Sequence, residues 1–345
     1  MSFAFLNTPS EIISEIEKSN ASQVFFLCDE NTYIHCFLPY FENHTFQTIV
    51  IASGESSKSI DTFEMICSHL SVNYADKNTL LVNLGGGMVC DIGGFVASVY
   101  KRGIRFINIP TTLLAMADAA YGGKTALNLG SVKNIIGSFY PAEKIILSDF
   151  FLNTLAPKEY HSGFAEICKS MLLFAPEEWK QFSQNPSYPA VYQVKPYVKL
   201  ALQCKQNIVE KDPLEKNERL SLNYGHSIGH AIEAVYNSKG FSLLHGEAIF
   251  WGMALENLLA FKLGLLQEDT MQSINQVLQT LYPLPIELVH IPEILEALKN
   301  DKKNDNDTIQ MVLLSDLGKY LLKVPVALGL IQETLENYAR PKQSN

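Results

Sequence analysis

The chain has 345 residues, 47% of them hydrophobic and 18% charged, and a formal net charge of −9. This length predicts two domains with a core in each, and the composition is typical of a soluble globular enzyme. The acidic balance excludes a nucleic-acid-binding surface of the usual kind, because such a surface needs a basic face.

Short apolar runs alternate with helix-period segments through the first 150 residues. Strands are predicted at 23–27, 48–52, 80–84, 105–109 and 144–147, and helices at 11–19, 57–70 and 92–100. This order predicts a parallel sheet with helices on its faces, a Rossmann-like α/β domain over residues 1–152.

The second half of the chain has a different pattern. Over residues 157–265, apolar residues recur almost throughout at the spacing of a helix. Strand-like runs follow at 308–314 and 320–324, before a last predicted helix at 331–338. We therefore predict a mainly α-helical, metal-binding domain over residues 153–345. No repeat or low-complexity linker separates the two parts, so the active site is expected in a cleft between them.

Three features bear on where the protein works. Residues 1–10 lack the basic and apolar regions of a signal peptide. Residues 80–99 are apolar enough to suggest a transmembrane helix, but five glycines, Asn83 and Asp91 favour a strand, a turn and a helix. The six cysteines form no CxxC pair or disulfide-like framework, so reduced thiols in a cytoplasmic protein are expected.

A glycine-rich turn follows the predicted strand at 80–84. The segment reads LLVNLGGGMVCDIGG over residues 80–94. Glycines before a helix let backbone amides approach an anion, as in dinucleotide sites. The spacing is not the usual GxGxxG, however, and a purely structural turn explains it about as well.

The segment 118–134, DAAYGGKTALNLGSVKN, places two lysines and two asparagines near a glycine pair. We predict that Lys124, Asn128, Lys133 and Asn134 lie in a loop that suits an anionic, hydroxyl-rich ligand. The alternative is an ordinary charged surface loop.

Polar residues recur at helical spacing in the stretch 219–245. Five of them fall in one arc of a predicted helix: Arg219, Asn223, His226, His230 and Glu233. His245 follows at the start of a second predicted helix. We expect His226 or His230, with His245 and a carboxylate, to bind a metal in an open site. An internally hydrogen-bonded polar face would produce the same pattern.

Another predicted helix, over residues 157–174, carries the helix-phased pair Glu166 and Lys169. The pair adds a carboxylate to the candidate metal ligands.

Taken together, these stretches resemble the 3-dehydroquinate synthases, a family of sugar phosphate cyclases. The resemblance runs from about residue 54 to residue 314 and rests on many motifs in the right order: GExxK (54–58), GGGxxxDxxGFxAxxYxRG (85–103), PTTLLAxxDxxxGGKTxxN (110–128), KNIIGSFYP (133–141), GxAExxK (163–169), RxxLNxGHSxGHAIEA (219–234), LHGE (244–247) and DKKN (301–304).

The resemblance implies a reaction that uses NAD and zinc, with cobalt as an alternative metal. The substrate would be 3-deoxy-D-arabino-heptulosonate 7-phosphate, a small anionic sugar phosphate. Transient oxidation by NAD, β-elimination of phosphate, reduction and an intramolecular aldol cyclisation would give 3-dehydroquinate. This is a step of the shikimate pathway.

The resemblance also implies roles for individual residues. The zinc ligands would be Glu166, His226 and His245. The residues around NAD would be Glu55, Lys58, Gly86, Gly87, Asp91, Thr111, Thr112, Asp118, Lys124 and Lys133. Those that hold the substrate or move its protons would be Asp118, Lys124, Asn134, Lys169, Lys205, Arg219, Asn223, His230 and Lys302. Arg102 would reach the substrate phosphate from a neighbouring subunit, which requires a homodimer.

The departures from the family pattern are small. Cys90 stands where a glycine is common, Glu218 where an apolar residue is expected, and the interval from His226 to His245 is a few residues long.

Three other functions compete with this one. A 2-deoxy-scyllo-inosose or valiolone synthase would share the fold, NAD and zinc. A metal-dependent alcohol or glycerol dehydrogenase would share the GGGxxxD turn but would not need the GGKT and KN segments. A non-catalytic protein would have lost at least one ligand or proton-transfer residue, and we find no such loss.

Overall fold

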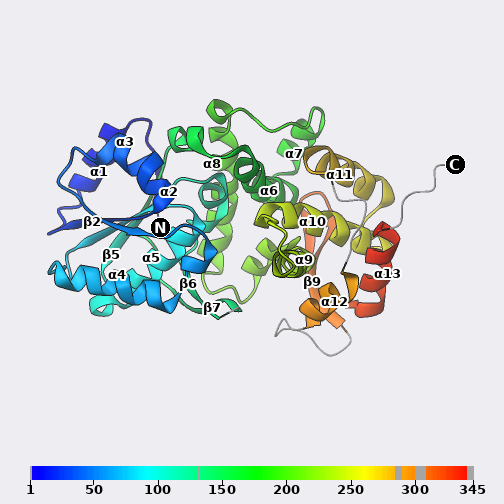
Figure 1. Cartoon of the computed structure of the whole chain (residues 1–345). Coiled ribbons are helices and arrows are strands. Elements are labelled where there is room, and N and C mark those ends of the chain that lie inside the picture. Colours follow the sequence, from blue (N-terminus) through cyan, green and yellow to red (C-terminus); the bar gives the residue numbers. More distant parts are fainter. Residues whose placement is uncertain (1, 131, 284–289, 300–307, 340–345) are drawn as a thin grey trace. The chain divides into compact units, whose positions relative to one another are not determined.

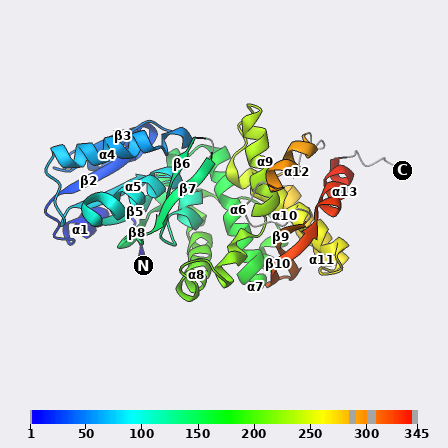
Figure 2. The ribbon, with the colours of Figure 1, turned by 90° about the horizontal axis from the view of Figure 1, so that it is seen from below.

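Six parallel strands form one sheet in the first part of the chain (Figures 1 and 2). The computed structural model describes residues 2–130, 132–283, 290–299 and 308–339. The strand order is β1 (Ser2–Phe5), β8 (Lys144–Leu147), β5 (Arg105–Pro110), β4 (Leu80–Gly85), β2 (Val24–Asp29) and β3 (Gln47–Ile51). The predicted parallel sheet is thus confirmed. The edge strand β1 was not predicted, since four residues are too few to give a clear period.

The chain divides into two compact units. One comprises Met1–Gly163 and Ala190–Gln206, and the other Phe164–Pro189 and Asn207–Asn345. The boundary predicted after residue 152 falls in the 3-10 segment Asp149–Thr154 and stays a prediction.

Helices and short helical turns connect the strands of the first unit. They include α1 (Pro9–Glu17), α2 (Glu30–Thr32), a π-helix (Tyr33–Phe37), α3 (Leu38–Phe41), α4 (Ile60–Val72), α5 (Gly87–Val99) and a second π-helix (Ala115–Ala119). Helix α5 packs closely on β4, because a Cβ on Gly93 would lie 1.9 Å from Asn83 Oδ1. The apolar stretch at 80–99 is therefore a strand, a turn and a helix, as predicted.

The segment 118–134 is not the loop that the sequence predicted. Its second half forms an antiparallel hairpin of β6 (Lys124–Leu129) and β7 (Val132–Phe139). The middle of β6 is buried, and a Cβ on Gly94 of α5 would lie 2.5 Å from Thr125 Cγ2. The glycines, lysines and asparagines of the segment hid this strand pattern, since all of them are depleted in strands.

The second unit is mainly helical, as predicted. It contains parts of α6 (Pro157–Phe174) and α8 (Lys195–Lys211), then α7 (Pro176–Ser183), α9 (His226–Ser238), α10 (His245–Lys262), α11 (Glu268–Leu281), α12 (Ile291–Lys299) and α13 (Leu328–Ala339). The two strand-like runs form the antiparallel hairpin β9 (Thr308–Asp316) and β10 (Lys319–Ala327).

Residues 219–233 do not form the single helix that the sequence predicted. A 3-10 helix over Glu218–Asn223 ends before Gly225, which has a φ of 79°, and α9 begins at His226. Glycine adopts this left-handed conformation without a Cβ penalty. Arg219 and Asn223 therefore do not belong to the helix that carries His226, His230 and Glu233.

Helices α9 and α10 lie side by side (Figure 1). Their backbones approach so closely that a Cβ on Gly252 of α10 would lie 1.8 Å from the carbonyl oxygen of Gly225. The carboxyl group of Glu256, also on α10, accepts hydrogen bonds from the amides of Gly225 (2.7 Å) and Ile228 (3.2 Å). Glu256 therefore satisfies amides at the start of α9 that have no partner within the helix.

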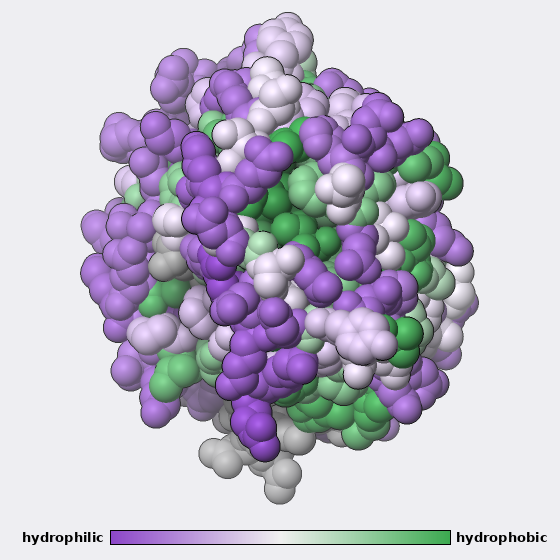
Figure 3. Space-filling view, turned by 90° about the vertical axis from the view of Figure 1, so that its left-hand side faces the viewer, coloured by the Kyte–Doolittle hydropathy of each residue, from purple (hydrophilic) through white to green (hydrophobic). Residues whose placement is uncertain are grey.

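None of the helices in the described residues is long and apolar enough to cross a membrane. On the face drawn in Figure 3, hydrophilic residues predominate, and hydrophobic residues gather in smaller groups between them. All six cysteines are free, in agreement with the prediction.

Candidate active site

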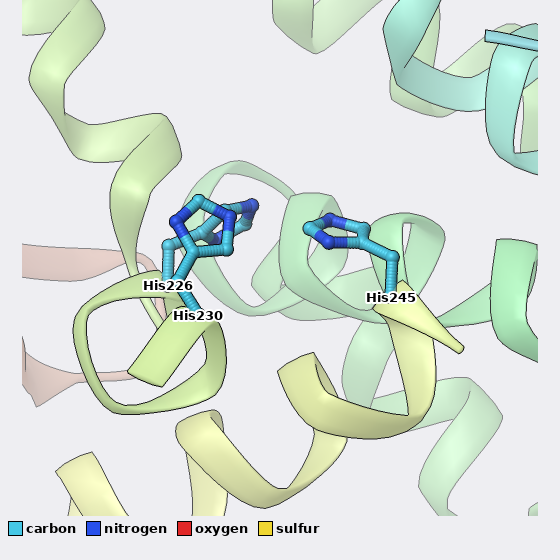
Figure 4. Close-up of side chains that lie close together, drawn as sticks. All are labelled: His226, His230 and His245. Carbon is cyan, nitrogen blue, oxygen red and sulfur yellow. The ribbon is translucent and has the colours of Figure 1, made fainter. Parts of the chain in front are cut away.

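Three histidines of the second unit converge on one point (Figure 4). His226 begins α9, His230 follows one turn later, and His245 begins α10. One ring nitrogen from each lies within 4.8 Å of the others. Imidazole nitrogens at this separation are typical ligands of zinc and other transition metals.

The carboxylate of Glu166 on α6 points at the same place. Its Oε1 lies 3.5 Å from His226 Nε2 and 3.6 Å from His245 Nε2. These distances are too long for hydrogen bonds, and Oε1 has no hydrogen-bond partner among the described residues. Ligand atoms of a tetrahedral zinc lie about 3.3 Å apart. A buried carboxylate oxygen and two imidazole nitrogens therefore fit a divalent cation.

The other ring nitrogens of two histidines are already engaged. His226 Nδ1 lies 3.0 Å from the carbonyl oxygen of Tyr224, and His245 Nδ1 lies 3.0 Å from Glu233 Oε2. Both partners can accept a hydrogen bond from Nδ1, which leaves Nε2, the nitrogen that faces Glu166, as the one that can bind a metal. Metal-binding histidines are commonly oriented in this way. This geometry supports Glu166, His226 and His245 as ligands.

Electrostatics keeps Glu166 ionised although it is fully buried. Burial alone would raise its pKa, but the positive charges of Lys169 and His245 outweigh burial and lower the pKa to about 2. Lys169 Nζ forms an ion pair with Glu166 Oε2 and donates to the carbonyl oxygen of Leu222 at 2.8 Å. These two contacts hold the ammonium group of Lys169 against the carboxylate of Glu166.

The two oriented histidines differ in their affinity for protons. Burial, and then the charge of Lys169, lowers the pKa of His226 well below its ordinary value. Burial also acts to lower the pKa of His245, but Glu166 and Glu233 outweigh burial and raise it to about 9. A metal at this site would therefore have to displace a proton from His245.

A cavity of about 630 Å³ adjoins His226 and His230. Glu215, Lys216, Asn223 and Ser227 continue its polar side, and the remaining described residues of the lining are Leu220, Ala231, Ala234, Ala297, Leu298, Ile309, Gln310, Met311, Val312 and Lys323. This volume is in the range of small-molecule sites.

The loop before α9 holds two of the predicted substrate residues. Asp212 accepts hydrogen bonds from the amides of Lys216, Asn217 and Arg219. The buried Arg219 donates from Nη1 to the carbonyl oxygen of Pro213 at 2.7 Å, and Asn223 donates to Glu215 Oε1 at 3.2 Å. Asn223 lines the cavity, whereas Arg219 is not part of its lining.

In the first unit, Lys58 is the centre of a polar network. Its buried Nζ lies 2.5 Å from Asp91 Oδ2 and also donates to Asn134 Oδ1. Asn128 donates to Glu55 Oε1 at 2.9 Å and accepts from the amide of Asn134 at 2.9 Å. The network connects five residues that the sequence analysis singled out and ties the hairpin to α5.

The glycine turn at the end of β4 is shaped for a close approach. A Cβ on Gly86 would lie 3.2 Å from Thr112 Cγ2, and one on Gly87 would lie 3.3 Å from Ala119 Cβ. Thr111 Oγ1 is buried at the end of β5 and has no hydrogen-bond partner among the described residues. Tight glycines at a helix N-terminus beside a buried hydroxyl fit the diphosphate and sugar of a dinucleotide.

The remaining predicted residues lie outside these groups. Lys205 donates to the carbonyl and carboxylate oxygens of Asp118 at 2.6 and 2.8 Å. Lys124 and Lys133 are exposed on the hairpin, and Arg102 is exposed in a left-handed conformation with a φ of 65°. Lys302 lies outside the described residues.

Known proteins match both halves of the chain. A family model described as 3-dehydroquinate synthase N-terminal matches residues 48–162, and one described as 3-dehydroquinate synthase C-terminal matches residues 163–304. The chain belongs to the 3-dehydroquinate synthase family. A 3-dehydroquinate synthase of Parabacteroides distasonis is 35% identical over 95% of both chains, and one of Campylobacter jejuni is 37% identical over 84% of both.

Solved structures resemble the family fold found here. A 2-deoxy-scyllo-inosose synthase solved with carbaglucose-6-phosphate, NAD+ and Co2+ has a TM-score of 0.87 at 27% identity and covers 97% of this chain and 96% of its own. A 2-epi-5-epi-valiolone synthase from Streptomyces hygroscopicus with NAD+ and Zn2+ has a TM-score of 0.84 at 25% identity, covering 98% and 97%. An iron-containing alcohol dehydrogenase from Corynebacterium glutamicum, at 13% identity and a TM-score of 0.65 over 99% and 96%, shares the fold alone.

The family motifs left several supporting residues unassigned. Glu233 was expected on the polar face, but only the structure pairs it with His245. Asp212 and Glu256 were not predicted, because a carboxylate that binds backbone amides has no distinctive spacing in the sequence. The short helical interval between His226 and Glu233 is the signal that could have assigned Glu233 to this site.

Replacing Glu256 with glutamine should reduce the pH dependence of stability. Burial raises the pKa of Glu256 from 4.5 to about 8. Between these values the folded chain keeps the proton and the unfolded chain releases it, so stability from this group falls as pH rises. The fall is at most about 1.4 kcal/mol per pH unit. Urea titrations between about pH 5 and 8 should give a smaller slope for the variant, whereas equal slopes would mean that Glu256 is ionised in the fold.

Proposed function

We propose that this chain is an NAD- and metal-dependent carbon–oxygen lyase that converts 3-deoxy-D-arabino-heptulosonate 7-phosphate to 3-dehydroquinate and phosphate. The observation that carries the proposal is the cluster of Glu166, His226 and His245, with its oriented imidazoles, in a member of the 3-dehydroquinate synthase family. The relatives at 35–38% identity carry that name.

The cofactors follow from the same comparison and from the fit of the residues. The 2-deoxy-scyllo-inosose synthase and the valiolone synthase were solved with NAD+ and with Co2+ or Zn2+. Glu166, His226 and His245 would hold the cation, and the glycine turn with Thr111 and Thr112 would hold NAD. When bound, the cation supplies Lewis acidity and NAD supplies a reversible hydride acceptor.

The chain's own side chains would bind the substrate and move its protons. His230 faces the cavity beside His226 and would act as a general acid or base. Asn223 lines the same cavity and would donate to a substrate hydroxyl or carboxylate. The Lys58 network fixes Asn134 on the hairpin, and Lys124 and Lys133 on that hairpin would attract anionic groups. Lys205, Arg219, Asp118 and Lys302 remain in the roles that the family resemblance implies.

Assembly and location are part of the proposal as well. We propose a cytoplasmic homodimer in which Arg102 of one subunit reaches the substrate phosphate of the other. The exposed position of Arg102 is compatible with this role.

The second candidate is another sugar phosphate cyclase, because the 2-deoxy-scyllo-inosose synthase structure matches almost the whole chain. The higher identity of the 3-dehydroquinate synthases ranks this candidate second. The alcohol dehydrogenases share the fold alone and carry no argument about substrate.

Purified protein with zinc and a catalytic amount of NAD should release phosphate from 3-deoxy-D-arabino-heptulosonate 7-phosphate. Because NAD is regenerated in each cycle, NADH should not accumulate, and a chelator should stop the release. A coupled phosphate assay with absorbance at the NADH band measures both. Release from hexose or heptulose phosphates without the carboxylate, and none from the heptulosonate, would favour the other cyclases.

A further inference from the structure

The pairing of strand β10 with β9 shifts register in the middle of the strand. Leu321 pairs with Leu313 and Val324 pairs with Met311, so Leu322 and Lys323 both stand opposite the single residue Val312. Lys323 has a φ of 54°, in the left-handed region. This is a β-bulge, and bulges bend a strand and redirect its side chains, often beside active sites. A non-glycine residue in this region costs free energy and persists only where its surroundings maintain it.

The bulged residue is the one that reaches the cavity. Of all β10 residues, each of which the structure describes, only Lys323 lines the cavity shared by His226, His230 and Asn223. Its ammonium group is exposed, and no carboxylate among the described residues forms an ion pair with it. Lys319 on the same strand, in contrast, has Asp316 at 3.2 Å.

The charges of the cavity favour an anion. Its described lining contains two ammonium groups, those of Lys216 and Lys323, and one carboxylate, that of Glu215. Glu215 accepts a hydrogen bond from Asn223. A chain with a net charge of −9 therefore presents a locally positive cavity beside its histidine cluster.

We propose that Lys323 binds an anionic group of the substrate. The bulge directs its ammonium group into the cavity, where it forms a charge-assisted hydrogen bond with a phosphate or carboxylate oxygen. This inference rests on the proposed function for the identity of the substrate. It adds a substrate-binding residue from the β9–β10 hairpin to those that the motifs of the chain identify.

Lys323→Gln should raise the KM for 3-deoxy-D-arabino-heptulosonate 7-phosphate about tenfold, equivalent to about 1.4 kcal/mol. The kcat should stay within about twofold, because an interaction present in both the ground state and the transition state affects binding alone. Added salt should raise the KM of the unsubstituted protein more than that of the variant, since screening acts on the charge. Lys323→Arg keeps the charge and should restore most of the affinity.

Two further variants separate binding from folding. Lys319→Gln removes a lysine of the same strand that does not line the cavity, and its KM should not change. Lys323→Gly removes the ammonium group while favouring the left-handed backbone, so it should fold well and still show the raised KM. The proposal would be overturned if the KM values of Lys323→Gln and Lys323→Gly were both the same as the KM of Lys319→Gln.

Calorimetric titration of the metal-loaded, NAD-free protein with the same heptulosonate phosphate distinguishes the two proposals. In one outcome, the heptulosonate phosphate binds, Lys323→Gln weakens the binding about tenfold, and the complete enzyme releases no phosphate. This result would support the Lys323 inference and overturn the proposed function. Turnover with no effect of Lys323→Gln would do the reverse. Absence of both binding and turnover in the unsubstituted protein would overturn both.

Discussion

Replacing His226 with alanine should remove the bound metal and lower kcat on the order of a thousandfold, about 4 kcal/mol of transition-state stabilisation. His226 Nε2 faces Glu166 Oε1 at 3.5 Å, and its Nδ1 is fixed by the carbonyl of Tyr224. Alanine leaves only Glu166 and His245 of the proposed ligand set. Metal content after dialysis, measured by mass spectrometry, tests this independently of activity.

The matched control is His230→Ala, in the same cluster and one turn along the same helix. This variant should keep its metal while kcat falls on the order of a hundredfold, the usual effect of losing a general acid or base. Metal loss in His230→Ala would instead indicate a three-histidine site. Glu166→Gln resolves the same question from the other side, because it should lose metal only if Glu166 is a ligand.

Replacing Gly252 with alanine should unfold the second unit or destabilise it by more than about 4 kcal/mol. The added Cβ would lie 1.8 Å from the carbonyl oxygen of Gly225, which is backbone and cannot move aside like a flexible side chain. Any relief would push α10 away from α9 and separate His245 from His226. Urea denaturation followed by circular dichroism measures the loss, and metal affinity should fall with it.

Gly329→Ala provides the control for the general effect of alanine in a helix. A Cβ on Gly329 meets nothing within 4 Å, and the residue lies in α13. Here the substitution should raise stability by up to about 1 kcal/mol, since alanine loses less backbone entropy than glycine in a helix. Equal stabilities for Gly252→Ala and the unsubstituted protein would mean that α9 and α10 are farther apart than described.

Most of the sheet could be predicted because its strands are buried on both faces. Residues such as Phe25, Leu27 and Leu81 belong to continuous apolar runs, and the runs alternate with helix-period segments. The β6–β7 hairpin could not be recognised in the same way. Its strands carry lysines, asparagines and glycines, and their pairing depends on contact with α5, which a local pattern does not contain.

The site was predictable in its components but not in its connections. Helical spacing brought His226 and His230 together, and it placed His245 on a helix N-terminus. Glu166 was a candidate on a separate helix, but spacing along one segment could not show that it lies beside these histidines. The spacing also predicted a helix that continues through Gly225, because the positive φ of one residue does not change the spacing of the apolar residues around it.

The position of β1 has a consequence for how the chain folds. Ser2–Phe5 pairs only with Lys144–Leu147, which is the strand of this sheet that comes last in the sequence. During synthesis it has no sheet partner until about 140 further residues have left the ribosome. Pairings this distant along the chain slow folding and lengthen the time that apolar segments stay exposed. The N-terminal strand is therefore the element for which co-translational folding offers the least help.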